Sequence, residues 1–139
     1  MELCTGGDLY KYMLNHAINE RLAKQLMIKL LRALQHVHSA NIIHRDIKPE
    51  NIMFGNDGEV KFIDFGFAIA QKRAVANMDI AGTPYYIAPE VLGGRYGKEC
   101  DVWSLGVLLY QMMTGEMPFD GNDEKEVFGK IKKGHYTYP

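Results

Sequence analysis

Residues His44–Asn51 read HRDIKPEN, and Asp64-Phe65-Gly66 follows thirteen residues beyond Asn51. The two segments supply an acid within reach of a hydroxyl group, a lysine beside it, and an asparagine and an aspartate that can share metal ions: Asp46, Lys48, Asn51 and Asp64. Transfer of a phosphoryl group needs these parts, because it depends on positioning and charge neutralisation and on little covalent chemistry. The spacing therefore predicts a phosphoryl-transfer site.

Upstream of this site the hydrophobic pattern is helical. Asp8 is suited to cap the N-terminus of a short helix. Asn19 opens a longer helix, in which apolar residues recur at steps of three and four: Leu22, Leu26, Met27, Leu30, Leu34 and Val37. We expect this helix to end near Ser39–Asn41.

Short β-like runs surround the site itself, at Ile42-Ile43, Ile52–Phe54 and Val60–Ile63. Asn56-Asp57-Gly58 lies between the last two runs and predicts a hairpin turn. The segment Phe67–Ile87 is long and partly polar, which favours an irregular functional loop or disorder.

Two further helices are expected downstream. Asp101–Thr114 is apolar on nearly all sides, which predicts a helix buried in the middle of the domain. Gly115 and Pro118 are expected to end it. Asp123–Lys133 predicts an exposed helix that stops at Gly134. The fold class expected from these patterns is mainly α with short β hairpins.

The composition narrows the choice of compartment and partners. The 139 residues leave room for one core, and a formal net charge of −1 argues against nucleic acid as the main partner. No apolar run approaches the roughly 20 residues of a membrane span, so no membrane association is expected. The two cysteines, Cys4 and Cys100, form no disulfide framework, which favours a reducing, cytoplasmic location.

The HRDIKPEN and Asp64-Phe65-Gly66 segments, followed by Ala88-Pro89-Glu90, closely resemble the catalytic signatures of eukaryotic protein kinases. The stretches GGDLY, GTPYYIAPEVL and YGKECDVWSLGVLLYQMMTGEMPF are most similar to the calmodulin-dependent and calcium-dependent protein kinase group. The resemblance implies a protein-kinase-like C-lobe core. It also implies Ser/Thr phosphorylation of protein substrates with ATP and Mg²⁺ as cofactors. The sequence contains no EF-hand loop pattern, so calcium control is not inferred from it.

The resemblance assigns catalytic roles by position. Asp46 would orient the substrate hydroxyl and take its proton, and Lys48 would neutralise charge on the transferring group. Lysine at this place marks Ser/Thr kinases in the family. Asn51 and Asp64 would bind Mg²⁺ beside the phosphates. Thr83 would contact Asp46 through its hydroxyl.

The resemblance also predicts the nucleotide contacts. Glu2 and Cys4 would lie in the hinge that meets adenine through backbone groups, and Asp8 would lie near the ribose. Met53 and Leu9 would form the apolar floor under adenine. A methionine and a leucine on apolar faces belong more often to a core than to a ligand site, and this alternative stays open.

Substrate choice is expected to depend on two carboxylates. By resemblance, Asp8 and Glu50 face the peptide groove, so a basic residue upstream of the phospho-acceptor is expected. Gln111 lies where some kinases that prefer basic substrates have a further glutamate, so preference for a second basic residue should be weaker.

Regulation is expected in the loop after Gly66. By resemblance, Arg45 marks kinases in which a loop phosphate pairs with that arginine. Residues 67–82 contain no Ser, Thr or Tyr, and Asp79 stands at the usual phosphosite position. An ion pair between Arg45 and Asp79 is therefore expected, and the alternative is that Asp79 is an exposed polar loop residue.

The resemblance also concerns residues behind the loop and the part of a kinase domain that the chain covers. His44 and Phe65 would belong to the family's internal hydrophobic stack, with Asp101 anchoring the His44 backbone. No GxGxxG motif is present. We therefore expect residues 1–139 to be a partial protein kinase domain, from the hinge to the helix G region, without the N-lobe and the last helices. The 139-residue chain alone is expected to have no kinase activity. The alternative is a non-catalytic kinase-like interaction module.

Overall fold

The computed structural model describes residues 5–71 and 79–138. Glu2 and Cys4 therefore lie outside the described residues. The helices are α1 (Leu9–Asn15), α2 (Glu20–Ser39), α3 (Pro89–Leu92), α4 (Glu99–Thr114) and α5 (Glu124–Lys133). The strands are β1 (Ile42–Ile43), β2 (Ile52–Phe54), β3 (Val60–Phe62) and β4 (Ile69–Ala70), and the 3-10 turns include η1 (Pro49–Asn51) and η3 (Pro84–Tyr86). The expected fold class, mainly α with short β hairpins, is confirmed.

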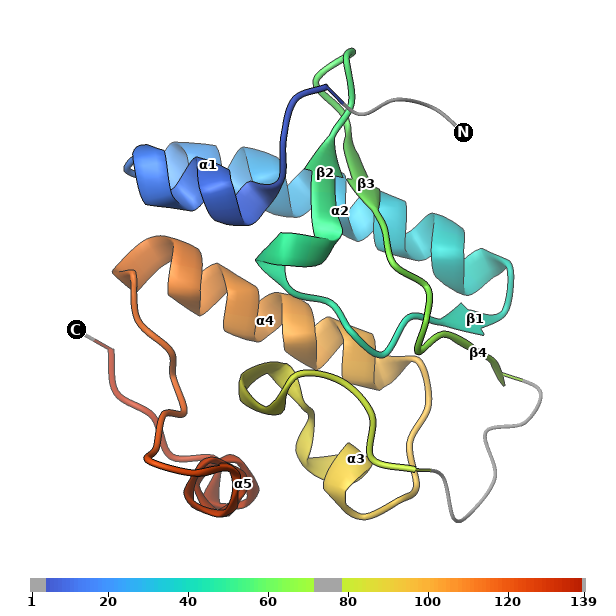
Figure 1. Cartoon of the computed structure of the whole chain (residues 1–139), viewed down its shortest axis with the longest axis vertical. Helices are drawn as coiled ribbons and strands as arrows, with labels where there is room; N and C mark the ends of the chain where they lie inside the picture. The colour runs from blue at the N-terminus through green and yellow to red at the C-terminus, as the bar shows by residue number, and fades with distance from the viewer. Residues whose placement is uncertain (1–4, 72–78, 139) are drawn as a thin grey trace.

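The strands form two small antiparallel sheets around the HRDIKPEN segment (Figure 1). Strands β2 and β3 make the predicted hairpin, with Ile52 opposite Phe62 and Phe54 opposite Val60. Gly58 has a φ of 76° in the turn between them, a left-handed conformation that glycine adopts without strain. Strand β1 pairs with β4 from beyond the Asp64-Phe65-Gly66 segment, so the two quoted segments are held together by both sheets.

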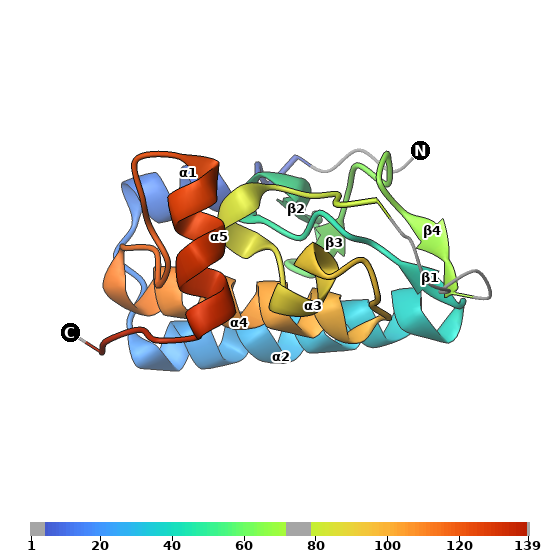
Figure 2. The ribbon, with the colours of Figure 1, turned by 90° about the horizontal axis from the view of Figure 1, so that it is seen from below.

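The long helices α2 and α4 pack side by side and carry one side of the molecule (Figure 2). The main core lies between these helices, α1 and the β2–β3 hairpin. Its buried members are Leu9, Leu26, Leu30, Leu34, Ile47, Ile52, Val60, Phe62, Leu105, Leu108 and Met112. The apolar stripe expected along α2 is thus confirmed as a core face. Within the described residues, no helix is long and apolar enough to cross a membrane.

Side-chain caps and glycines set the helix ends where the sequence predicts them. Asp8 accepts a hydrogen bond from the Lys11 amide at 2.8 Å and caps α1. Asn19 caps α2 in the same way. Gly115 and Gly134 follow α4 and α5 in left-handed conformations, with φ of 76° and 67°. These local signals therefore fix the boundaries to within two residues.

The segment Phe67–Ile87 is more ordered than predicted, where it is described. Ile69–Ala70 forms strand β4, because its backbone pairs with a strand 27 residues earlier in the chain, at Ile42 and Ile43. Pro84–Tyr86 forms the turn η3, and the short helix α3 follows it. The local sequence carries no signal for the β1–β4 pairing, since the partner strand is distant in sequence.

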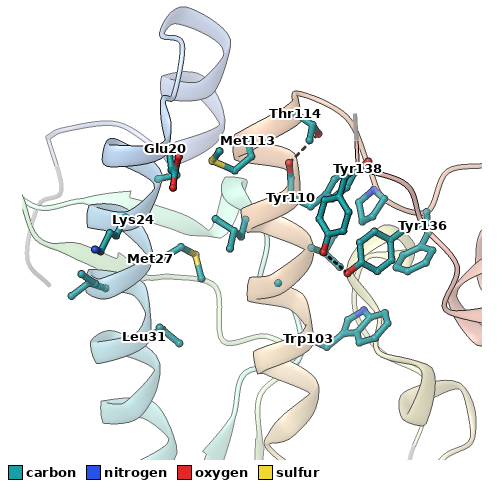
Figure 3. Close-up of a pocket in the computed structure, with 17 residues that line it drawn as sticks. Glu20, Lys24, Met27, Leu31, Trp103, Tyr110, Met113, Thr114, Tyr136 and Tyr138 are labelled. Carbon is teal, nitrogen blue, oxygen red and sulfur yellow. Dashed lines mark hydrogen bonds between the residues drawn. The ribbon is translucent and has the colours of Figure 1, made fainter.

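Helix α4 is not buried on all sides, which corrects the prediction from its composition. Leu105 and Leu108 lie in the core, whereas Val102, Leu109 and Met113 are 52%, 37% and 45% exposed. Part of this open face lines an apolar groove of about 810 Å³ between α2, α4 and the C-terminal segment (Figure 3). Tyr136 and Tyr138 line the groove from the C-terminal segment. The groove shares no residue with the HRDIKPEN segment.

Candidate functional site

Asp46 stands at the centre of a polar cluster and is 5% exposed. Its Oδ1 accepts a hydrogen bond from the Thr83 hydroxyl at 2.8 Å, and its Oδ2 lies 3.6 Å from Lys48 Nζ. Lys48 Nζ also donates to Thr83 Oγ1 at 2.9 Å. The expected contact between Thr83 and Asp46 is thus present. A hydroxyl and an ammonium group therefore hold the carboxylate in one orientation.

Asn51 links this cluster to the hairpin. Its Nδ2 donates to Asp46 Oδ2 at 3.0 Å and to the Asp46 carbonyl at 2.9 Å. With the amide nitrogen used in this way, the amide oxygen is left as an acceptor. The Ile63 amide donates to the Asn51 carbonyl at 2.9 Å, so Asp64 follows directly on the residue paired with Asn51.

The donor set at Asn51 and Asp64 fits a hard divalent cation. Asp64 has a left-handed backbone, with φ of 55°, and its carboxylate is exposed, with Oδ1 accepting a hydrogen bond from the nearby Gly66 amide at 3.2 Å. One carboxylate and one amide oxygen are ligands that Mg²⁺ accepts when phosphate oxygens supply the rest. Among the described residues no group of three or more His, Cys, Asp or Glu side chains could hold a metal without such help.

Asp101 fixes the backbone of the HRDIKPEN segment from the start of α4. It is fully buried, and its carboxylate accepts hydrogen bonds from the amides of His44 and Arg45, both at 2.9 Å. His38, at the end of α2, adds a third contact at 2.8 Å. The expected anchoring of His44 by Asp101 is confirmed. Arg45 needs this anchor, because its φ of 68° is uncommon for a residue other than glycine.

His44 packs behind the site with both ring nitrogens satisfied. Its ring meets that of Phe65 edge-on at 4.8 Å, as expected for the internal stack. Nδ1 accepts from the Asp46 amide at 3.2 Å and Nε2 lies 3.0 Å from the Ile63 carbonyl, which fits a neutral ring with its proton on Nε2. His44 thereby ties Asp46 to the residue before Asp64.

The residues expected to meet the nucleotide are only partly brought together. Asp8 and Met53 form an isolated antiparallel bridge, so their backbones are adjacent. Met53 is half-buried, as a ligand floor requires. Leu9, however, is fully buried in the main core, because α1 packs that face against the η1 turn and β2. Its expected role under adenine is therefore wrong, and the alternative of a core residue holds.

Tyr86 and Gln111 form a second pair of contacting polar side chains. The Tyr86 hydroxyl donates to Gln111 Oε1 at 2.6 Å. Burial raises the pKa of the Tyr86 phenol, and the charge of Glu50 acts in the same direction. Tyr86 thus contacts Gln111, one of the residues expected to influence substrate choice.

The ion pair expected between Arg45 and Asp79 is not formed. Instead, Arg45 Nε donates to the Phe67 carbonyl at 2.5 Å and Nη1 donates to the Tyr96 hydroxyl at 2.8 Å. That hydroxyl donates onward to the Asp79 backbone carbonyl at 2.9 Å. Asp79 therefore joins the network through its backbone, because the Tyr96 side chain stands between it and the guanidinium.

Two residues near the site were not predicted from the sequence. Tyr96 bridges Arg45 and Asp79, and Ser104 on α4 donates to the Tyr86 carbonyl at 2.8 Å. Each lies next to a motif in space and at least 17 residues from its partner in sequence, so no local pattern identifies it. Burial raises the pKa of the Cys100 thiol, so this cysteine is unreactive.

The sequence profile of the protein kinase domain matches residues 1–138 of the chain. The chain therefore belongs to the protein kinase family. Among curated proteins it is 42% identical to calcium-dependent protein kinase 5 of Plasmodium berghei, over 99% of this chain and 25% of that protein. It is 44% identical to calcium-dependent protein kinase 25 of Arabidopsis thaliana, over 96% of this chain and 26% of that protein.

These relatives confirm the resemblance to the calcium-dependent protein kinase group. The chain spans about a quarter of the length of the curated relatives that it matches.

Proposed function

We propose that residues 1–139 carry the phosphoryl-transfer and peptide-binding part of a Ser/Thr protein kinase, and that they correspond to the C-lobe. The observation that carries the proposal is the cluster in which Asp46 accepts from Thr83 at 2.8 Å and from Asn51 at 3.0 Å, with Lys48 beside it. In this cluster Asp46 orients the substrate hydroxyl and accepts its proton late in the transfer.

Lys48 and Thr83 support this role through different oxygens of the Asp46 carboxylate. The Lys48 side chain is 25% exposed, so its ammonium group can meet the transferring phosphoryl group while it stays near Asp46. Thr83 fixes the rotation of the Asp46 carboxylate. It also lies on the surface on which the peptide would bind. Together the two contacts hold both oxygens of Asp46 in defined directions, which positioning catalysis requires.

Asn51 and Asp64 would hold Mg²⁺ together with phosphate oxygens of ATP. When bound, the cation neutralises charge on the phosphates. Asn51 also contributes to the site when no cation is bound, because its amide nitrogen holds Asp46 in place. Asp8 and Met53 would line the part of the site that faces the nucleotide.

We further propose that the protein is located in the cytoplasm.

The proposed activity can be tested in a chimeric kinase in which residues 1–139 replace the matching segment of Plasmodium berghei calcium-dependent protein kinase 5. We expect transfer of label from [γ-³²P]ATP to a Ser/Thr peptide library. Asp64→Ala should abolish this transfer, whereas Asp57→Ala, which removes an exposed carboxylate in the β2–β3 turn, should preserve it. The 139-residue chain alone should show no transfer, because it contains no GxGxxG phosphate-binding motif.

A chimera that is folded by circular dichroism but transfers no label would contradict the proposal. Peptide binding without turnover in that chimera would instead support the second candidate, a kinase-like interaction module. The isolated chain is tested separately, and robust ATP-dependent phosphorylation by the 139 residues alone would overturn the expectation that they need a phosphate-binding loop.

Substrate preference gives a further prediction. We expect the chimera to favour a basic residue upstream of the phospho-acceptor, because Asp8 and Glu50 would present carboxylates there. The preference should be moderate, since Asp8 already caps α1 and lies 3.6 Å from Lys11. Exposed charge pairs contribute about 0.2–1 kcal/mol, or up to about fivefold in rate.

A positional-scanning peptide array measures this preference. Glu50→Gln should reduce selection for the basic residue, and Glu116→Gln, a change at an exposed glutamate on the loop after α4, should not. Equal use of acidic and basic residues at every upstream position would show that these carboxylates do not select the substrate.

A further inference from the structure

Arg45 connects the catalytic segment to three other parts of the chain. Its amide is held by Asp101, and its side chain donates to the Phe67 carbonyl and to the Tyr96 hydroxyl. Phe67 directly follows Gly66, so the guanidinium contacts the chain just beyond the proposed metal site. Arg45 thus lies where the catalytic loop, the loop after Gly66 and the loop before α4 meet.

The Tyr96 hydroxyl has the chemistry needed to extend this connection. It accepts from Arg45 Nη1 at 2.8 Å and donates to the Asp79 carbonyl at 2.9 Å. A hydroxyl can accept and donate at once, whereas a carboxylate could only accept and would repel the carbonyl oxygen. A neutral side chain therefore joins a cation to a backbone acceptor.

Packing fixes where this hydroxyl lies. Tyr96 is 8% exposed, and its ring belongs to a buried cluster with Ile43, Ile87, Ala88, Val91 and Cys100. A tyrosine has two side-chain torsions, so burial of the ring leaves the hydroxyl little freedom. The bridge is therefore built into the core and does not depend on a flexible surface side chain.

The segment held by Tyr96 leads directly to the catalytic cluster. Asp79 is four residues before Thr83, whose hydroxyl donates to Asp46. Between them, Gly82 has a φ of +110°, and a Cβ there would lie 2.5 Å from the Arg45 carbonyl oxygen. The segment 79–83 thus runs against the Arg45 backbone, with Tyr96 at one end and Asp46 at the other.

We propose that Tyr96 is a positioning residue of the phosphoryl-transfer site, and that its hydroxyl holds the segment 79–83 so that Thr83 meets Asp46. This inference rests on the proposed function for its catalytic consequence. It replaces the predicted Arg45–Asp79 ion pair by a neutral bridge. A backbone carbonyl is the acceptor, so the Asp79 side chain is dispensable for the contact.

The first test uses the 139-residue chain and needs no catalysis. Hydrogen–deuterium exchange, read by mass spectrometry over residues 79–86, should be about 3- to 10-fold faster in Tyr96→Phe, the range expected for loss of one hydrogen bond. Tyr110→Phe is the matched control, because it removes a hydroxyl that donates to the Thr137 carbonyl at 2.6 Å, away from the site. Asp79→Ala should also leave exchange unchanged.

Unchanged exchange in Tyr96→Phe, or an equal acceleration in Asp79→Ala, would overturn the bridge. If Tyr96→Phe does not fold, Arg45→Lys provides the second variant, because lysine keeps the charge but cannot donate from two separate nitrogens. It should speed exchange over the same residues, and wild-type exchange in that variant would equally overturn the bridge.

The second test separates positioning from a purely structural role. In the chimeric kinase, Tyr96→Phe should lower kcat about 10-fold and leave KM for ATP unchanged, because the contact lies on the peptide side of Asp46. Faster exchange with an unchanged kcat would show that the bridge is structural only. An inactive parent chimera would count against the proposed function, while the exchange result would still decide the bridge.

Discussion

Asp46→Asn is expected to lower kcat of the chimeric kinase by about 10² or more, the scale of a positioned acid–base group. The change removes the charge and the proton acceptor but keeps the size of the side chain. An amide oxygen can still accept from Thr83, while the amide nitrogen would face Asn51 Nδ2, so the geometry is weakened as well. Steady-state kinetics with saturating ATP and peptide measure the effect.

The matched control is Asp120→Asn, which makes the same chemical change at an exposed residue after α4. It should keep near-normal turnover. If Asp46→Asn retained turnover within a few-fold of the parent and the thermal midpoint were unchanged, Asp46 would not be the residue that positions the hydroxyl.

Asp101→Ala is expected to destabilise the 139-residue chain by about 3–5 kcal/mol, the cost of removing one partner from a buried ionic network. The carboxylate is fully buried and accepts from the amides of His44 and Arg45 and from His38. Its loss leaves buried donors without acceptors, and each such donor costs about 1–3 kcal/mol. Urea denaturation followed by circular dichroism measures the change in the free energy of unfolding.

Asp120→Ala serves as the control for this prediction and should change stability by less than about 0.5 kcal/mol, as expected for a surface substitution. If Asp101→Ala lowered the free energy of unfolding by less than about 1 kcal/mol, the backbone of the HRDIKPEN segment would hold its shape without this anchor. In that case the left-handed conformation at Arg45 would need another explanation.

The polar cluster around Asp46, proposed as the catalytic site, was the part of the molecule most open to prediction from sequence. Asp46, Lys48 and Asn51 are close in the chain, so a short motif carries their geometry. The contact with Thr83 and the anchoring by Asp101 were expected only from resemblance to kinases, and both are present. The helix ends were also predictable, because caps such as Asp8 and glycines such as Gly134 act locally.

The errors arose where a distant segment decides the outcome. Strand β4 forms because β1 lies beside it, and the composition of residues 69–70 does not reveal this. Leu9 is buried because α1 packs on the hairpin, which its apolar character alone could not distinguish from a ligand contact. Asp79 has the position expected for a partner of Arg45, but Tyr96 occupies the space between them.

The site of phosphate attachment tests the proposed chemistry in a single measurement. Peptides that each contain one Ser, one Thr and one Tyr are incubated with ATP, Mg²⁺ and the chimeric kinase, and tandem mass spectrometry locates the phosphate. We predict phosphate on Ser or Thr, and none when Asp46 is changed to Asn. Phosphate on Tyr, or equal phosphorylation by the Asp46→Asn variant, would contradict the assignment of this cluster as a Ser/Thr phosphoryl-transfer site.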